Sequence, residues 1–150
     1  MIKRIPLKPA TARLPYAHRG LHDRERGVIE NSLPAFEAAI RSGFGIECDV
    51  RPSRDGTAMV FHDAMLDRLT AATGEVQRRS TNDLCEIPLI GSIPRSTIPT
   101  LTDLLALVDG RCPAFGRGQE RMGDGRSGLH PSRRRTCQRL PDQRRARPAA

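Results

Sequence analysis

The segment from residue 44 to residue 63, FGIECDVRPSRDGTAMVFHD, constrains the fold more than any other part of the chain. Two apolar runs flank an Asp-Gly pair, which is a strong signal for a short β-hairpin. Successive side chains of a strand point to opposite faces, so Glu47 and Asp49 share one face and Cys48 lies on the other. The pattern predicts a pair of oxygen ligands on one face and a small core cysteine on the other.

The Asp-Gly pair also places a histidine. If Asp55 and Gly56 form a two-residue turn, counting outward puts Asp49 directly opposite His62, with their Cβ atoms about 5 Å apart. Pro52 cannot donate to a strand ladder, so it marks the point at which a bulge would shift this register. The alternative interpretation is a solvated polar face of an amphipathic hairpin, without chemistry.

The flanking segments predict a strand and helices in alternation. The apolar run at 14–17 predicts a buried strand that ends at His18, which is either a capped structural residue or a catalytic one. Apolar residues at helical spacing predict helices over 33–40 and 101–108. The candidate N-caps are Asn31 or Ser32 for the first helix and Thr100 or Thr102 for the second. A strand, loop, helix and strand in this order indicate an α/β fold.

The charge divides the chain into unequal parts. Residues 1–111 carry a net charge of +1, whereas residues 112–150 hold 10 Arg against 3 acids. Residues 1–13 predict an extended arm, and the tail is either solvated and disordered or a binder of polyanions. Its candidate contacts are Arg133, Arg134, Arg135, Arg144, Arg145 and Arg147. Only Phe115 could stack on bases there, so nucleic acid is disfavoured. No run is long enough for a membrane span, and we expect a cytoplasmic protein.

A series of short motifs resembles the glycerophosphodiester phosphodiesterase family. The motifs are HRG at 18–20, ENS with LPAFEAAI at 30–40, IECDV at 46–50, DG at 55–56, VFHD at 60–63, LDRLT at 66–70 and IPTL at 98–101. The resemblance spans residues 14–111 and implies the N-terminal fragment of a TIM-type (β/α) barrel. It also implies metal-assisted hydrolysis of a glycerophosphodiester, a small molecule, to glycerol 3-phosphate and an alcohol. A related lipid phosphodiesterase, of the sphingomyelinase D kind, stays open.

The resemblance assigns roles to five residues. It implies that His18 and His62 are the general acid/base pair, that Arg19 contacts the substrate phosphate, and that Glu47 and Asp49 are two of the metal ligands. General chemistry agrees, because carboxylate oxygens suit Mg²⁺ or Ca²⁺ and imidazole titrates near neutral pH.

The resemblance breaks at residue 112. It implies a third ligand, a Glu in a strand with the pattern V-E-V-K soon after residue 110, but residues 112–150 contain no Val, Ile or Lys. The composition predicts a disordered Arg-rich tail in place of that strand. Back-translating residues 112–123 and reading one nucleotide later allows V-P-L-L-V-E-V-K. We hypothesise that the tail is translated out of frame and that this chain is a truncated, impaired enzyme.

Overall fold

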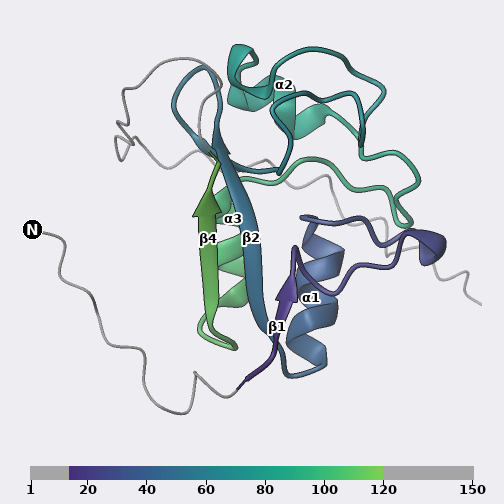
Figure 1. Ribbon diagram of the computed structural model, residues 1–150, viewed down its shortest axis with the longest axis vertical. Coiled ribbons are helices and arrows are strands. Elements are labelled where there is room, and N and C mark those ends of the chain that lie inside the picture. The colour runs from purple at the N-terminus through teal and green to yellow at the C-terminus, as the bar shows by residue number, and fades with distance from the viewer. Residues whose placement is uncertain (1–13, 120–150) are drawn as a thin grey trace, which may run out of the picture.

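The computed structural model describes residues 14–119 (Figure 1). The strands are β1 (Tyr16–His18), β2 (Gly45–Pro52), β3 (Ala58–Val60) and β4 (Ala114–Gly118). The helices are α1 (Leu33–Arg41), α2 (Thr81–Glu86) and α3 (Leu101–Val108), with 3-10 turns η2 (Arg24–Arg26) and η3 (Val76–Arg78). The predicted arm at 1–13 and the tail arginines beyond residue 119 lie outside the described residues. Within residues 14–119, no helix is long and apolar enough to cross a bilayer.

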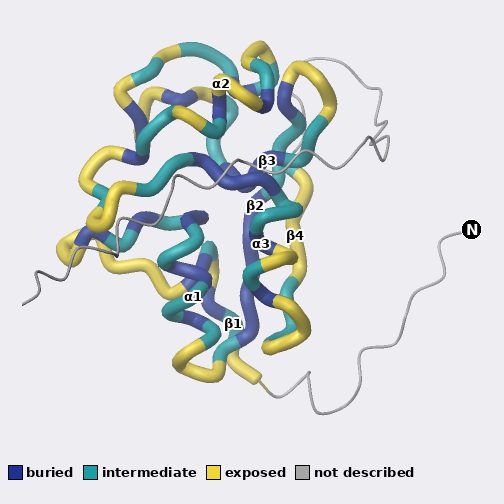
Figure 2. Tube along the Cα trace, turned by 180° about the vertical axis from the view of Figure 1, so that it is seen from behind, coloured by how far each residue is buried: buried dark blue, intermediate teal, exposed yellow. Residues whose placement is uncertain are grey.

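Strand β2 is the centre of the sheet. Its beginning pairs in parallel with β1, and its end pairs antiparallel with β3. Strand β4 runs parallel to β2 on the opposite edge, since Ile46 pairs with Ala17 on one side and with Ala114 on the other. Helices α1 and α3 lie together on one face of this sheet, as the view from behind shows (Figure 2). Within residues 14–119, no helix lies on the opposite face.

The main core lies between the sheet and helices α1 and α3. Ile46 and Cys48 point to this side of β2 and pack with residues of both helices, among them Phe36 and Leu104. Burial, and then the charges of the neighbouring Glu47 and Asp49, raise the pKa of the Cys48 thiol to about 12. The predicted core role of Cys48 is therefore confirmed.

Both long helices form where helical spacing predicts them, and each begins at a side-chain cap. The Ser32 hydroxyl accepts from the Ala35 N–H, and Thr100 accepts from the Asp103 N–H in a capping box. These caps satisfy backbone donors that have no partner within the helix. Of the alternatives that the sequence left open, Ser32 and Thr100 are the N-caps.

A second core fixes the segment that follows β3. Nine buried apolar residues meet around α2 and the loops on either side of it: Ile29, Met59, Phe61, Leu66, Leu69, Val76, Leu84, Leu89 and Ile98. This cluster holds residues 61–70 against the rest of the molecule although they contain no long helix. His62 therefore sits on an anchored segment.

The sequence predicts a disordered tail without a strand from residue 112 onward. This prediction is wrong at 114–118, because these residues form β4. Residues 114–118 pair with β2 from Ile46 to Val50. The neighbouring strand leaves little room for a side chain at position 116, because a Cβ atom on Gly116 would lie 3.0 Å from Val50 Cγ2. Four of the five β4 residues are exposed, so this strand needs no alternating apolar pattern. Backbone pairing along β2 forms a strand that side-chain composition did not indicate.

The predicted hairpin register is also wrong, by one residue. Val50 pairs with Val60, and the Phe61 N–H donates to the Asp49 carbonyl, so Asp49 faces Phe61 and not His62. The loop between the paired residues Ser53 and Thr57 is three residues long, with Gly56 in the left-handed region at φ 81°. A turn followed by a left-handed glycine is the usual form of a three-residue hairpin loop, and it shifts the pairing by one.

Candidate active site

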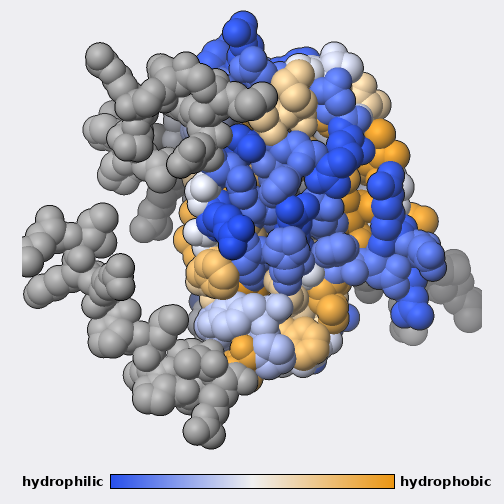
Figure 3. Space-filling view, in the orientation of Figure 1, coloured by the Kyte–Doolittle hydropathy of each residue, from blue (hydrophilic) through white to orange (hydrophobic). Residues whose placement is uncertain are grey.

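Polar side chains gather on the sheet face opposite α1 and α3. Because side chains alternate along each strand, His18 of β1, Glu47 and Asp49 of β2 and Arg117 of β4 share this face. Hydrophilic residues cover its centre and the end toward which the parallel strands run (Figure 3). The carboxyl ends of parallel strands meet at one edge of a sheet, which is where α/β proteins build their sites.

Asp49 is almost fully buried, with 2% of its surface exposed, and its carboxylate is held from several sides. The Asn31 amide donates to Oδ2 at 3.2 Å and accepts from the Asp49 N–H at 3.2 Å. The Gln119 amide donates to Oδ1 at 2.5 Å, and Arg19 Nε lies 3.0 Å from Oδ2 as an ion pair. These partners offset the cost of burying the charge.

Glu47 is buried but only partly satisfied. Its Oε2 accepts a hydrogen bond from the backbone N–H of Arg19 at 3.2 Å and lies 3.9 Å from His18 Nε2. Its Oε1 is buried without a hydrogen-bond partner, and Arg117 Nε lies 3.9 Å away. A carboxylate oxygen in this state retains the capacity to accept a bond from a ligand.

Arg19 reaches both acids because of an unusual turn after β1. Its own φ is 60°, and Gly20 follows with φ 79°. A Cβ atom on Gly20 would lie 2.9 Å from the Ala35 backbone carbon, so only glycine fits this approach to α1. Positive φ in an arginine costs energy and is found where the surrounding structure over-determines it, often at functional sites.

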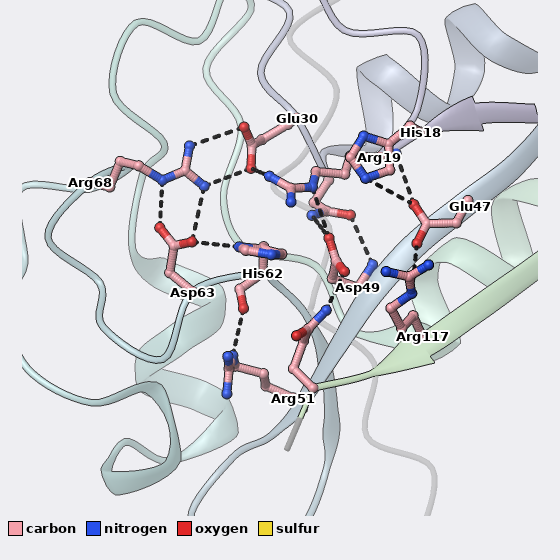
Figure 4. Close-up of polar contacts among 12 residues, drawn as sticks. His18, Arg19, Glu30, Glu47, Asp49, Arg51, His62, Asp63, Arg68 and Arg117 are labelled. Atoms are coloured by element: carbon pink, nitrogen blue, oxygen red, sulfur yellow. Dashed lines mark hydrogen bonds and ion pairs between the residues drawn. The ribbon is translucent and has the colours of Figure 1, made fainter. Parts of the chain in front are cut away.

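His62 lies just after β3 and is oriented by its neighbour. Its Nδ1 is 2.6 Å from Asp63 Oδ1, and its carbonyl oxygen accepts from Arg51 Nε at 2.6 Å (Figure 4). Burial raises the pKa of Asp63, but hydrogen bonds from Arg68 and His62 outweigh it and hold that pKa below its usual range. An ionised carboxylate only accepts, so Nδ1 carries a proton and donates to Asp63.

Comparisons with known proteins identify the family. A model of the "Glycerophosphoryl diester phosphodiesterase family" matches residues 18–115, which is more than half of the chain. The chain belongs to this family. A Mycobacterium tuberculosis protein named "Probable glycerophosphodiester phosphodiesterase 2" is 40% identical over 101 residues, covering 66% of this chain and 36% of the relative. The resemblance that the motifs indicated is thereby confirmed.

Solved structures give the same result for the fold. The glycerophosphodiester phosphodiesterase of Agrobacterium tumefaciens matches with a TM-score of 0.62 and 30% identity, over 70% of this chain and 46% of that one. An Oleispira antarctica phosphodiesterase in complex with the product sn-glycerol-3-phosphate matches with a TM-score of 0.64 and 26% identity, over 73% and 47%. The chain thus spans less than half the length of these family members. The predicted α/β fold, part of a TIM-type barrel, is confirmed.

The family resemblance implies a divalent cation, but the described residues do not complete a site for one. Glu47 and Asp49 offer oxygen donors, and the unpartnered Oε1 of Glu47 is an atom that a cation would satisfy. The next position on the same face, beside Asp49, is Arg117, whose guanidinium repels a cation. No group of three acidic, histidine or cysteine ligands exists within residues 14–119. The described residues therefore supply two carboxylates for a cation, with the arginine of β4 in the position beside them.

Several residues that shape the site did not emerge from the sequence. Asn31 was a candidate helix cap, whereas its side chain binds Asp49. Glu30, Arg68 and Gln119 received no role, although each contacts a site residue or its partner. For Glu30, Asn31 and Arg68 a signal existed, since all three lie in the motifs ENS and LDRLT that carried the resemblance. Gln119 follows β4, which the sequence did not predict.

Proposed function

We propose that this chain carries the acid–base and phosphate-binding part of a site that hydrolyses glycerophosphodiesters to glycerol 3-phosphate and an alcohol. One observation supports this most: five residues from three separate segments lie near one another, at the end of β1, along β2 and in the loop after β3 (Figure 4). They are His18, Arg19, Glu47, Asp49 and His62. The substrate class follows from the family and from the product that the Oleispira antarctica neighbour binds.

In this proposal the two histidines move the protons. One imidazole takes a proton from the water whose oxygen attacks phosphorus, and the other gives a proton to the alcohol oxygen as its bond to phosphorus breaks. His62 suits such a role because its contact with Asp63 is made through Nδ1, which leaves Nε2 for the proton transfer. His18 has 67% of its side chain exposed, which leaves it open to a substrate that enters from solvent.

Arg19 is the proposed phosphate contact. A guanidinium offers parallel N–H donors that match two phosphate oxygens. Only 18% of its side chain is exposed, and it bridges Asp49 and Glu30, so its direction is fixed before substrate arrives. Prior orientation of this kind lowers the entropy that binding costs.

We further propose that the 150-residue chain is impaired as an enzyme. Mg²⁺ or Ca²⁺ assistance, with Glu47 and Asp49 as ligands, would require a third acidic ligand, and Arg117 stands beside them instead. Without a cation the charge that develops on the phosphoryl oxygens is offset by arginines alone. We expect this chain to bind the product of the family reaction and to turn over substrate slowly or not at all.

Binding of sn-glycerol 3-phosphate tests the proposed site without relying on turnover. Isothermal titration calorimetry of the 150-residue chain is expected to detect binding that Arg19→Gln weakens about tenfold or more, since one charge-assisted bond contributes roughly 1.5–3 kcal/mol. Arg24→Gln is the matched control, because Arg24 is an exposed arginine in η2. Equal affinity of both variants for sn-glycerol 3-phosphate would remove Arg19 from the site.

A further inference from the structure

Arg68 joins two carboxylates that are far apart in the sequence. It lies in the turn after β3, outside the regular elements, and its side chain is 43% exposed. Its Nη1 and Nη2 donate to the two oxygens of Glu30 at 3.0 and 2.7 Å. Its Nε and Nη2 donate to the two oxygens of Asp63 at 2.5 and 3.2 Å. One guanidinium thus binds two carboxylates, each through a pair of hydrogen bonds (Figure 4).

Each of these carboxylates contacts a residue of the proposed site. Glu30 Oε1 accepts from Arg19 Nη1 at 2.9 Å, and Asp63 Oδ1 pairs with His62 Nδ1 at 2.6 Å. The carboxylates are more buried than Arg68, with 14% and 23% of their side chains exposed. A continuous chain of polar contacts therefore runs from His62 through Arg68 to Arg19.

We propose that Arg68 is a positioning residue that fixes His62 and Arg19 relative to one another through Asp63 and Glu30. This rests on the proposed function, which gives those two residues their roles. Arg68 itself contacts neither of the side chains it positions. Partners of this outer kind set the orientation and tautomer of the groups that react, and their loss typically reduces activity or affinity 10- to 100-fold.

The side chain at this position has to be an arginine for geometric reasons. A planar guanidinium presents donors in a rigid fork, so it can bind two carboxylates in pairs of nearly parallel bonds. A lysine ammonium is a point charge on a flexible stem and can hold one carboxylate well, but not both in fixed directions. The network also keeps its members ionised: although burial raises the pKa of Glu30, hydrogen bonds from Arg68 and Arg19 lower it below the usual value.

The tautomer of the His62 ring reports this positioning directly. Long-range ¹H–¹⁵N NMR of the 150-residue chain is expected to show the Nδ1–H tautomer in the wild type. Arg68→Gln should mix the two tautomers, since Asp63 loses the partner that fixes its carboxylate. Arg68→Lys, which retains the positive charge, should give an intermediate result. Arg78→Gln is the matched control, because Arg78 is an exposed arginine whose ion pair is with Glu75 and not with a residue of the proposed site.

A second readout on the same variants is the affinity for sn-glycerol 3-phosphate. Arg68→Gln is expected to weaken binding about tenfold, since Arg19 loses the carboxylate arrangement that aims it. An unchanged His62 tautomer and an unchanged affinity in both Arg68 variants would overturn the proposal. If the wild type does not bind sn-glycerol 3-phosphate at all, the proposed function fails. The tautomer comparison still decides whether Arg68 orients His62.

Discussion

At the residue scale, the site is built by side chains that hold Asp49 and Glu47 in a buried position. Asn31 makes two of these contacts with one side chain, because its amide both donates to the Asp49 carboxylate and accepts from the Asp49 backbone N–H. It does so with a left-handed backbone at φ 55°, which asparagine tolerates better than most residues. Asn31 therefore links the start of α1 to the central strand.

Replacing Asn31 with glycine should test that link. Glycine tolerates the left-handed backbone, so the variant removes the two side-chain bonds without adding backbone strain. We expect Asn31→Gly to lower the free energy of unfolding by about 1–3 kcal/mol, because buried groups of Asp49 lose their partners. Urea unfolding measures the change. The exposed Asn82 is the control, and a loss for Asn82→Ala as large as that for Asn31→Gly would contradict the account.

At the element scale, the helices and the β2–β3 hairpin were predictable, whereas the hairpin register and the pairing of β4 were not. Apolar spacing and caps are local features, so α1 and α3 follow from the sequence between residues 31 and 108. The hairpin register depends on whether the loop has two or three residues, and Asp55-Gly56 is compatible with both. Strand β4 depends on pairing with β2, more than 60 residues earlier, which composition does not reveal.

The hairpin loop and helix α2 are joined through Asp55, which makes their contact sensitive to acid. Its carboxylate accepts from Ser53 Oγ at 2.6 Å and from the Thr81 N–H and Oγ1 at 3.0 and 2.7 Å. Burial raises the pKa of Asp55, but these hydrogen bonds outweigh it and lower the pKa from 3.8 to about 2. The stabilisation is present above about pH 4 and is lost as the pH falls toward 2.

The measurement is urea unfolding between pH 5 and pH 2. Wild type should lose stability over this interval more steeply than Asp55→Asn, since the variant lacks the carboxyl group that becomes protonated. Asp109→Asn should retain the wild-type steepness, because Asp109 lies at the end of α3, away from this contact. Identical pH profiles for wild type and Asp55→Asn would show that the contact contributes nothing.

Strand β4 carries the residue that we propose to prevent cation binding, Arg117. Arg117 pairs with Asp49 in the β2–β4 ladder, and it is also the position at which the shifted reading frame allows a Glu. Arg117→Glu would set a third carboxylate beside Glu47 and Asp49. We expect this variant to bind Ca²⁺ at least tenfold more tightly than wild type in calorimetry. Arg117→Gln removes the positive charge without adding a ligand, and equal Ca²⁺ affinity for all three would refute this role of β4.

At the scale of the whole molecule, the sequence was sufficient to predict the family, but not to predict which charged side chains lie beside Glu47 and Asp49. Motifs spread from His18 to Leu101 resemble the family, and the family match extends through Phe115, beyond the boundary expected at residue 112. His18, Arg19 and His62 were named from motifs, whereas Arg117, which lies beside the two acids, was not. The ion pairs of Arg19 with Asp49 and of Arg117 with Glu47 form only when β1 and β4 pair with β2, so they could not be predicted from the sequence.

The release of glycerol 3-phosphate from glycerophosphocholine, assayed with Mg²⁺ or Ca²⁺, tests the central claim most directly. Three proteins are compared: the 150-residue chain, a chain with the shifted frame restored after residue 111, and the restored chain with His62→Ala. We predict turnover only in the restored chain and its loss in the variant, because a complete set of ligands and His62 are both required. Metal-dependent turnover by the 150-residue chain itself would contradict the claim that Arg117 leaves its site incomplete.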